Sequence, residues 1–380
     1  MKIIHISDLH IGKTIRQISL YEDQKYILLT EIMRVIDSKK PDVVLLSGDI
    51  FDTSIPSGES LVLYQDFLKE LLNRNIKVLS ISGNHDSPVR IDYLKELLSH
   101  SGYYVSGCYK GHVDHQTLRD EYGDVCFYLL PYLSPESIRP YFKDVKMNTD
   151  RPYELAVSTA LNAEDIDCSK RNVILSHQFV IGGKRDPSDT VVSFGKANIS
   201  DQVSLSVYSK FDYVALGHIH KSMIFDNGRI VYPGAILPYH EDESNDRYVS
   251  YVELGEKGNI KQELIKINPK HKILKIRDEY ASVLSKPDNK EDFVAITLTG
   301  EVNDPQASVK LSNKFDKLIS IRRESMEFAS SEQQSKFSPA KEPIDTISEF
   351  YKTRTGHDID EGEEKIVKDI LKEIMEGDTL

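Results

Sequence analysis

The chain has 380 residues, a length that corresponds to roughly two or three domains. Its formal net charge of −12 argues against a protein that coats nucleic acid through bulk positive charge, although a local basic surface could still hold phosphates. Cys108, Cys126 and Cys168 are too few and too scattered for a disulfide framework. We expect neither a signal peptide nor a membrane span, and therefore a soluble protein of the cytoplasm.

Five short apolar runs each end in Asp, Asn or His, which is the pattern of a buried strand that opens into a polar loop. In chain order these runs are Ile3 to Ser7 before Asp8 and His10, Val43 to Ser47 before Asp49 and Asp52, Lys77 to Ser82 before Asn84 and His85, Val173 to Ser176 before His177, and Tyr213 to Leu216 before His218 and His220. We expect the five strands to deliver these side chains to one edge of one core.

Amphipathic helices are predicted beside these strands, because apolar residues recur at helical spacing. The predicted helices run from Glu22 to Ser38, from Ser57 to Asn75, from Pro88 through Leu98, and from Tyr153 to Asn162. The strand, helix, strand order favours parallel pairing of the first strands. Two later runs, Tyr248 to Leu254 and Ile260 to Ile267, predict an antiparallel hairpin that completes the second sheet of a β-sandwich.

The composition changes after the hairpin, where lysines crowd a short stretch that includes Lys272 and Lys275. Strands at Phe293 to Thr299 and Lys317 to Arg323 are predicted around a helix near Val309 to Phe315. Residues 330–343 are rich in Ser, Gln, Lys and Pro, which is typical of a linker. Two short helices are predicted beyond it, at 344–352 and 361–376.

The residue types at the five strand ends predict a metal centre. Carboxylate oxygen, amide oxygen and imidazole nitrogen together suit a divalent ion such as Mn, Fe or Zn, and none of these loops contains a cysteine. The candidate ligands are too many for one ion but suit two ions about 3.5–4 Å apart that share a carboxylate. Such a pair makes hydroxide available near neutral pH, so the implied reaction is hydrolysis of a phosphate ester. The candidate ligands are Asp8, His10, Asp49, Asn84, His177, His218 and His220.

The ordered set of these motifs resembles the calcineurin-like metallophosphoesterase superfamily. Within it, the segments Ser7 to Lys13, Gly83 to Pro88 and Tyr232 to Gly234 are similar to those of the SbcD-type nuclease subunits. The resemblance implies an α/β fold, a four-layer metallophosphoesterase β-sandwich flanked by helices, with a small α+β capping domain and a C-terminal helical segment. It implies a nuclease domain at 1–267, a capping domain at 268–329, the linker at 330–343 and a partner-binding segment at 344–380.

The resemblance also implies a role for each motif residue. One ion, expected to be Mn, would be held by Asp8, His10, Asp49 and His220, and the other by Asp49, Asn84, His177 and His218. His85 would contact the scissile phosphate or protonate the leaving oxygen, since imidazole has an unperturbed pKa of about 6.5. Asp52 would support catalysis, and both Asp52 and Asp86 would orient a histidine.

Each assignment has a structural alternative. A single histidine at a strand end is often only a satisfied polar residue, and Asp52 by itself could be a helix N-cap or a turn residue. The other histidines, including His5 and His240, lack the motif context and are expected to be structural or surface residues. The five motifs in order favour the metal interpretation over these alternatives.

The resemblance further implies DNA as substrate, digested as a 3′ to 5′ double-strand exonuclease and a single-strand endonuclease. Five basic residues are candidates for DNA contact, although each could equally be a solvated surface charge: Lys13, Arg16, Arg90, Lys272 and Lys275. A homodimer is expected through the helices near Leu61 and Leu97, whose apolar residues could instead pack on their own sheet. The C-terminal helices would bind the coiled coil of an SbcC-type ATPase, or pack on the capping domain.

Two other functions need consideration. One is a stand-alone small-molecule phosphodiesterase or a phosphoprotein phosphatase on the same scaffold. The phosphatase form usually has Arg directly after the Gly-Asp-x-x-Asp motif, whereas Thr53 and Ser54 follow it here. The other is a noncatalytic DNA-tethering subunit, which a complete set of metal ligands argues against.

Overall fold

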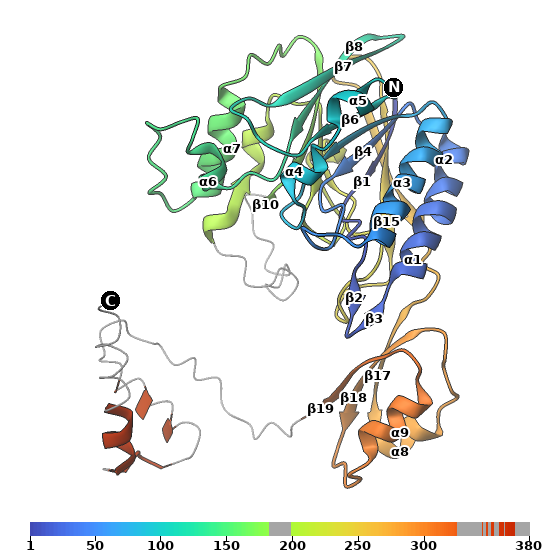
Figure 1. Ribbon diagram of the computed structural model, residues 1–380, viewed down its shortest axis with the longest axis vertical. Helices are drawn as coiled ribbons and strands as arrows, with labels where there is room; N and C mark the ends of the chain where they lie inside the picture. The colour runs from blue at the N-terminus through green and yellow to red at the C-terminus, as the bar shows by residue number, and fades with distance from the viewer. Residues whose placement is uncertain are drawn as a thin grey trace. The chain divides into compact units, whose positions relative to one another are not determined.

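The computed structural model describes residues 1–181, 199–324, 344, 347–348, 351–352, 357–360 and 362–368 (Figure 1). Residues Met1–Glu324 form one compact unit, and the chain from Ser325 onward forms another. The predicted linker lies outside the described residues, as does much of the two predicted C-terminal helices; residues 362–368 are helical. Among the described helices, none combines the length and the apolar character that crossing a membrane requires.

The first sheet has six strands in the order β16-β15-β1-β4-β5-β6. Strands β1, β4, β5 and β6 pair in parallel, whereas β15 runs antiparallel to both β1 and β16. The predicted hairpin exists, but it extends this first sheet, so its placement in the second sheet was wrong. Alternating apolar and polar residues predict a hairpin, but they do not show which sheet the hairpin joins. Here the pairing of Ile3 with Val252 places it beside β1. The strands are β1 (Lys2–Ile6), β4 (Val43–Ser47), β5 (Lys77–Ile81), β6 (Tyr103–Ser106), β15 (Arg247–Leu254) and β16 (Ile260–Ile267).

The second sheet also has six strands, in the order β13-β14-β12-β9-β8-β7. Its centre is formed by β8, β9, β12 and β14, which are mutually parallel. Three of the five strands that lead into polar loops therefore belong to the first sheet and two to the second. The strands are β7 (Asp114–Asp120), β8 (Gly123–Leu130), β9 (Arg171–His177), β12 (Tyr213–Gly217), β13 (Met223–Phe225) and β14 (Ile230–Tyr232).

Three buried clusters show that the phosphoesterase domain has four layers, as the family resemblance implied. Val43 and Leu45 of β4 point into a core between the two sheets, whereas Val44 and Leu46 point to a core beneath the helices. A third core lies between the second sheet and α7 (Pro152–Asn162). Because side chains alternate along a strand, a strand that is apolar at every position must be covered on both faces.

The first two predicted helices are present with small differences at their ends. The helix predicted at 22–38 consists of α1 (Tyr21–Tyr26), a π-helical segment η1 (Ile27–Ile32) and α2 (Met33–Lys39). The second is α3 (Gly58–Asn73), in which the Ser57 side chain caps the backbone N–H of Ser60. The remaining short elements are β2 (Thr14–Ile15), β3 (Ile18–Ser19), α6 (Pro135–Ile138), β10 (Phe179–Ile181), η3 (Ile199–Asp201), β11 (Gln202–Ser204), η4 (Leu205–Tyr208) and η5 (Asp226–Gly228).

The helix predicted after Pro88 is broken into α4 (Pro88–Ile91) and α5 (Lys95–Ser99), so the prediction of one continuous helix was wrong. Leu94 between them adopts a left-handed conformation with φ of 61°. The carboxylate of Asp92 accepts a hydrogen bond of 2.6 Å from the backbone N–H of Gly107, just after β6. This tertiary contact holds the chain where the helix is interrupted.

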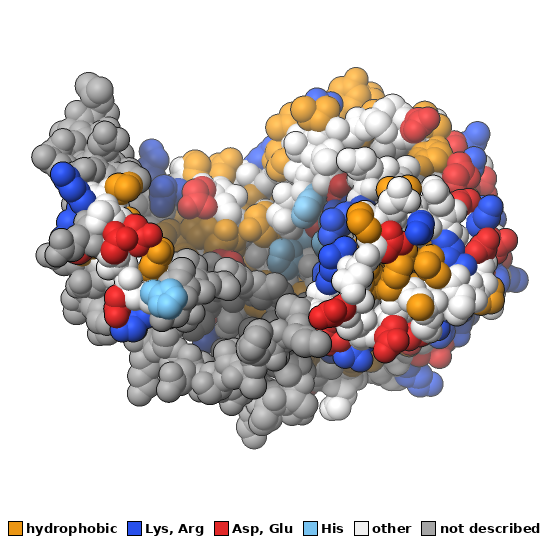
Figure 2. All heavy atoms as spheres, turned by 90° about the horizontal axis from the view of Figure 1, so that it is seen from below, with side chains coloured by type: hydrophobic (Ala, Val, Ile, Leu, Met, Phe, Trp, Pro, Cys, Tyr) orange, Lys and Arg blue, Asp and Glu red, His pale blue; other side chains and the backbone are white. Residues whose placement is uncertain are grey.

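Residues beyond the hairpin form a three-stranded parallel sheet in the order β17-β18-β19, covered by two helices. Its own small core includes Val294, Ile296 and Leu311, while Phe293 joins the core of the main sheet. Figure 2 looks at the molecule from this end and shows acidic and basic side chains interspersed. The elements are β17 (Ile273–Glu279), α8 (Tyr280–Ser285), β18 (Phe293–Thr299), α9 (Ala307–Lys314) and β19 (Leu318–Arg323).

Candidate metal centre

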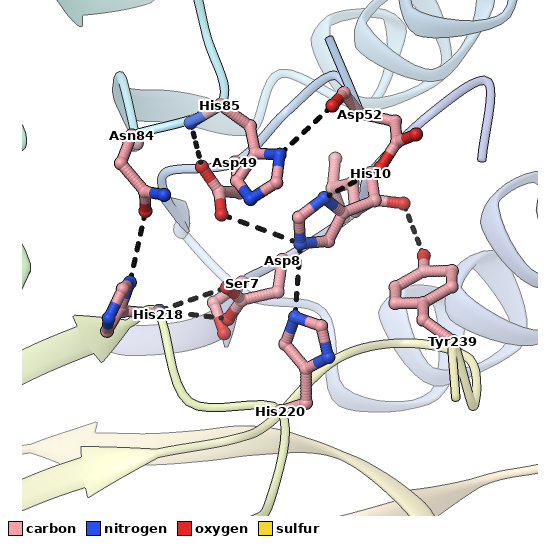
Figure 3. Close-up of polar contacts among 12 residues, drawn as sticks. Ser7, Asp8, His10, Asp49, Asp52, Asn84, His85, His218, His220 and Tyr239 are labelled. Carbon is pink, nitrogen blue, oxygen red and sulfur yellow. Dashed lines mark hydrogen bonds and ion pairs between the residues drawn. The ribbon is translucent and has the colours of Figure 1, made fainter. Parts of the chain in front are cut away.

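Side chains from the loops that follow β1, β4, β5 and β12 point toward one another in Figure 3. His177 at the end of β9 joins them, because its Nε2 lies 3.3 Å from Asp49 Oδ2. The loops after β1 and β4 are tied together by backbone hydrogen bonds from His10 to Asp49 (2.9 Å) and from Asp8 to Gly48 (3.2 Å). Four of the predicted ligands adopt positive φ, a region that non-glycine residues rarely occupy and that clusters at functional sites. These are Asp8 (54°), His10 (42°), Asp49 (48°) and His218 (101°).

Glycines allow the loops to approach this closely. A Cβ at Gly83 would lie 2.1 Å from the Asp49 carboxylate, and one at Gly217 would lie 1.9 Å from the carbonyl oxygen of Ser47. Neither position can carry a larger residue without moving a neighbouring loop. The glycines of the sequence motifs therefore bring the carboxylate and the imidazoles together.

One group of donor atoms is formed by Asp8, His10 and His220, whose ligand atoms lie within 4.8 Å of one another. The Nε2 atoms of His10 and His220 face each other at 3.1 Å. Burial lowers the pKa of His10, so its imidazole is neutral near pH 7 and offers a lone pair. Two imidazoles and a carboxylate directed at one point form a donor set that suits a divalent cation.

A second group is formed by Asp8, Asp49 and His177, also within 4.8 Å, together with Asn84 and His218. The side-chain oxygen of Asn84 lies 3.1 Å from His177 Nε2 and 3.0 Å from His218 Nδ1. The other nitrogen of His177, Nδ1, lies 2.8 Å from the carbonyl oxygen of Ser47, so it donates its proton there and directs Nε2 into the site. Burial lowers the pKa of His218 to about 4.

Asp49 lies between the two groups. Its Oδ2 is 3.5 Å from His10 Nε2 and 3.3 Å from His177 Nε2, and its Oδ1 accepts a hydrogen bond of 2.9 Å from the backbone N–H of His85. Burial raises the pKa of Asp49, but the charge of His177 and then of His10 outweighs it, so the pKa lies well below its usual range. Burial by itself would lower the pKa of His177, but the charge of Asp49 outweighs it and raises the pKa to about 9.

His85 and Asp52 lie at the edge of this centre. The Nδ1 of His85 is 3.0 Å from the backbone carbonyl of Asp52 and donates to it, which leaves Nε2 free to exchange a proton. The Asp52 carboxylate lies 3.5 Å from His10 Nδ1 and accepts a hydrogen bond of 2.9 Å from the Lys13 ammonium. Asp52 therefore contacts two histidines, one through its side chain and one through its backbone.

Asp86 does not orient a histidine, so that prediction was wrong. Its buried carboxylate accepts hydrogen bonds from the backbone N–H groups of Ile50 (3.1 Å), Phe51 (2.9 Å) and Gly83 (2.8 Å). Burial, and next the charge of Asp49, raises its pKa to about 6. Asp86 holds the loop after β4 against the loop after β5, which the spacing of the motif could not show.

Sequence reasoning missed residues that support the loops from outside the motifs. Gln24 on α1 donates hydrogen bonds to the carbonyls of His10 (2.6 Å) and Leu9 (3.3 Å). Tyr239 donates its hydroxyl proton to the Leu9 carbonyl, and Glu243 accepts from His220 Nδ1 at 2.9 Å. Glutamine in an amphipathic helix and glutamate in an acidic run carry no signal of their own, because such residues usually face solvent.

The basic residues predicted to contact DNA occupy different places. Lys13 lies at the centre, paired with Asp52, while Arg16 and Arg90 are exposed on nearby loops and on α4. Lys272 and Lys275 are exposed at the start of β17, and Lys275 donates to the carbonyl of Asp242 at 2.9 Å. Their contact with DNA stays a prediction.

Comparison with known proteins agrees with this geometry. The family model for calcineurin-like phosphoesterases matches residues 1–222, a range that contains all five loops. The chain is also 27% identical to the SbcD subunit of the nuclease SbcCD of Staphylococcus epidermidis (strain ATCC 12228 / FDA PCI 1200), an alignment that covers 99% of each protein. The chain therefore belongs to the calcineurin-like phosphoesterase family and is a metal-dependent hydrolase of phosphate esters.

Proposed function

We propose that this chain is the nuclease subunit of an SbcCD-type complex and hydrolyses DNA phosphodiester bonds with two Mn ions. The observation that carries the proposal is the position of Asp49, whose Oδ2 lies 3.5 Å from His10 and 3.3 Å from His177, between two groups of donor atoms. Full-length similarity to a relative named as a nuclease subunit supports DNA as the substrate.

The donor set fits a pair of divalent ions, because all its atoms are carboxylate oxygen, amide oxygen or imidazole nitrogen. Asp8, His10, Asp49 and His220 would hold one ion, and Asp49, Asn84, His177 and His218 the other. When bound, the two ions would supply charge stabilisation at phosphorus and a nucleophilic water near neutral pH. The chain orients His177 for this by a hydrogen bond between the far nitrogen of its ring and the Ser47 carbonyl.

His85 would move a proton during the reaction. Because its Nδ1–H is held by the Asp52 carbonyl at 3.0 Å, its Nε2 is the atom that gains and loses a proton. Its backbone N–H donates to Asp49, so the same residue links the bridging carboxylate to the edge of the site. His85 is exposed, as a group must be to reach a bulky phosphodiester.

The three-stranded sheet that follows the phosphoesterase domain favours a polymeric substrate. The three-stranded sheet would help to select DNA, with Lys272 and Lys275 contacting phosphates, and Lys13, Arg16 and Arg90 would do so nearer the centre. We expect 3′ to 5′ exonuclease activity on duplexes and endonuclease activity on single strands. A minimal phosphodiesterase has no need for such an addition.

The proposal includes a homodimer and an ATPase partner. Exposed apolar side chains occur on α3 and on the segment from α4 to α5, with Val89 73% and Tyr93 72% exposed, and such residues favour burial against a second copy. In the C-terminal segment, Ile366 lies on a helix and is 61% exposed, as expected of a surface that binds an SbcC-type coiled coil.

The proposal is tested with purified protein and MnCl₂, with and without the SbcC-type ATPase. End-blocked and open DNA duplexes are compared with bis-p-nitrophenyl phosphate. Cleavage of DNA that is stimulated by the ATPase is the expected result. Hydrolysis of the chromogenic compound with no cleavage of any DNA would favour the stand-alone phosphodiesterase.

A further inference from the structure

The segment from Tyr239 to Arg247 lies outside the residues that match the phosphoesterase family model, yet it contacts the metal centre. It is the second half of the connection from β14 to β15, ends at the first residue of β15, and passes beside the loop that carries His220. None of its residues was selected from sequence, and His240 was expected to be structural or on the surface. The contacts of Glu243 within this segment give it a specific role.

Both carboxylate oxygens of Glu243 are engaged. Oε1 lies 2.9 Å from Nδ1 of His220, and Oε2 accepts a hydrogen bond of 2.6 Å from the Arg247 guanidinium and one of 3.3 Å from the Tyr239 backbone. A guanidinium can only donate, so its pairing with Oε2 leaves Oε1 as the acceptor that faces His220 Nδ1.

Because Glu243 Oε1 lies 2.9 Å from His220 Nδ1, it determines what the other nitrogen of His220 can do. The imidazole must carry a proton on Nδ1 to donate it to Glu243, so Nε2 has a free lone pair in the neutral ring. That Nε2 faces His10 Nε2 at 3.1 Å, which is the point where the first group of donor atoms converges. Carboxylates placed in this way fix the ring orientation and raise the basicity of metal-binding histidines.

Arg247 holds this arrangement from the other side. Its guanidinium donates to Glu243 and also to the backbone carbonyls of His220 (3.0 Å) and Ser244 (2.7 Å), and the residue is 3% exposed. The backbone and the side chain of His220 are thus fixed by one partly buried ion pair. Neighbouring residues anchor the segment further, since the side chain of Asn245 accepts from the N–H of Ile273 (2.8 Å) and donates to its carbonyl (2.9 Å).

We propose that Glu243 is a positioning residue of the metal centre, which holds His220 in the tautomer and orientation that present Nε2 to the ion shared with His10. This inference rests on the proposed function. A different possibility is a separate ion held by His220, His240 and Glu243, whose ligand atoms lie within 4.8 Å of one another. The contacts favour positioning, because Glu243 and His220 Nδ1 already face each other and Arg247 occupies the second oxygen.

The test measures metal binding to the full-length chain by Mn²⁺ titration, with EPR detection of free Mn²⁺ and metal analysis after dialysis. The variants are Glu243→Gln, which removes the charge, and Glu243→Asp, which keeps the charge but shortens the side chain by one methylene. Glu241→Gln is the matched control, since Glu241 lies in the same segment and pairs with Arg322 on β19. The unfolding temperature of each metal-free protein is measured in parallel.

We expect the wild type and Glu241→Gln to bind two ions equally well. Both Glu243 variants should keep one ion at wild-type affinity and bind the other about 10–100-fold more weakly, with loss of the spin-coupled EPR signal of the pair. If the Gln variant does not fold, the Asp variant still tests the positioning role, because it preserves the negative charge that pairs with Arg247.

Unchanged affinity for both ions in the Glu243 variants, or an equal loss of both, would overturn the proposal and leave Glu243 a purely structural residue. A third ion in the wild type that the variants lose would also overturn it, because Glu243 would then be a ligand. A wild type that binds no metal pair or cleaves no phosphodiester contradicts the proposed function instead, so the two failures are distinguishable.

Discussion

The metal centre and the three-stranded sheet both contain many charged side chains, but they use them differently. In the metal centre, Asp49 is 2% exposed and its neighbours are imidazoles and backbone N–H groups at fixed distances. On the three-stranded sheet the ion pairs lie at the surface, such as Lys310 with Asp304 at 2.7 Å and Arg277 with Glu324 at 2.6 Å. Water replaces a surface partner readily but cannot replace a buried one. The following changes test this contrast, beginning with the largest expected effect.

Asp49→Ala should lower activity on the order of a thousandfold or more, because the Asp49 carboxylate lies 3.5 Å from His10 of the first group and 3.3 Å from His177 of the second. It should also remove tightly bound metal. The measurements are Mn²⁺ stoichiometry and the rate of DNA cleavage. Retention of two ions by the variant would contradict the bridging role.

His85→Ala should lower the cleavage rate by about 10²–10⁴-fold while two Mn²⁺ ions remain bound, since its ring hydrogen bonds to the Asp52 carbonyl and belongs to neither group of donor atoms. Single-turnover cleavage and metal analysis are measured on the same sample. His240→Ala provides the matched control, because His240 is an exposed histidine near the same centre. A variant that cleaves duplex DNA at the wild-type rate would refute the assignment.

Metal binding should release a proton and strengthen as the pH rises. The pKa of His177 is raised to about 9 in the metal-free protein, so its ring is protonated at pH 7 and must lose that proton to bind an ion. The apparent affinity should increase about tenfold per pH unit up to about pH 9 and then level off. Calorimetry in buffers of different ionisation enthalpy measures the proton release, and heats that do not depend on the buffer would contradict it.

Leu311→Ala should destabilise the three-stranded sheet by about 2–5 kcal/mol, because Leu311 is fully buried in the small core of that sheet. Hydrogen exchange of the β17, β18 and β19 amides measures the loss. Hydrolysis of bis-p-nitrophenyl phosphate should be unchanged while DNA cleavage falls. Equal losses on both substrates would show that the sheet supports the metal centre itself.

Arg277→Ala should have the smallest effect, with no measurable change in unfolding temperature or Mn²⁺ affinity. Its guanidinium is 67% exposed and pairs with a partly exposed carboxylate, where salt screens the attraction. Differential scanning calorimetry at two salt concentrations measures the change. A marked loss at low salt would show that surface pairs hold this sheet together.

The sequence predicted most of the elements that position the centre because their signals are local. Each apolar run that ends in a polar loop became a strand with its side chains at the expected end, and the four-layer sandwich that the family resemblance implied is present. Three predictions that depended on distant contacts were wrong. The β15–β16 hairpin pairs with β1, Asp92 binds Gly107 where the helix breaks, and Asp86 binds backbone N–H groups instead of a histidine.

The residue types and their order along the chain were sufficient to determine the phosphoesterase family and the residues that converge, because carboxylate, amide and imidazole after five strands have few other uses. Only the tertiary structure decided which atoms face each other, such as the pairing of Asn84 with both His177 and His218 and the support of His220 by Glu243. The physical reason is that a hydrogen bond between residues far apart in the chain depends on the packing of the loops, which no local pattern encodes.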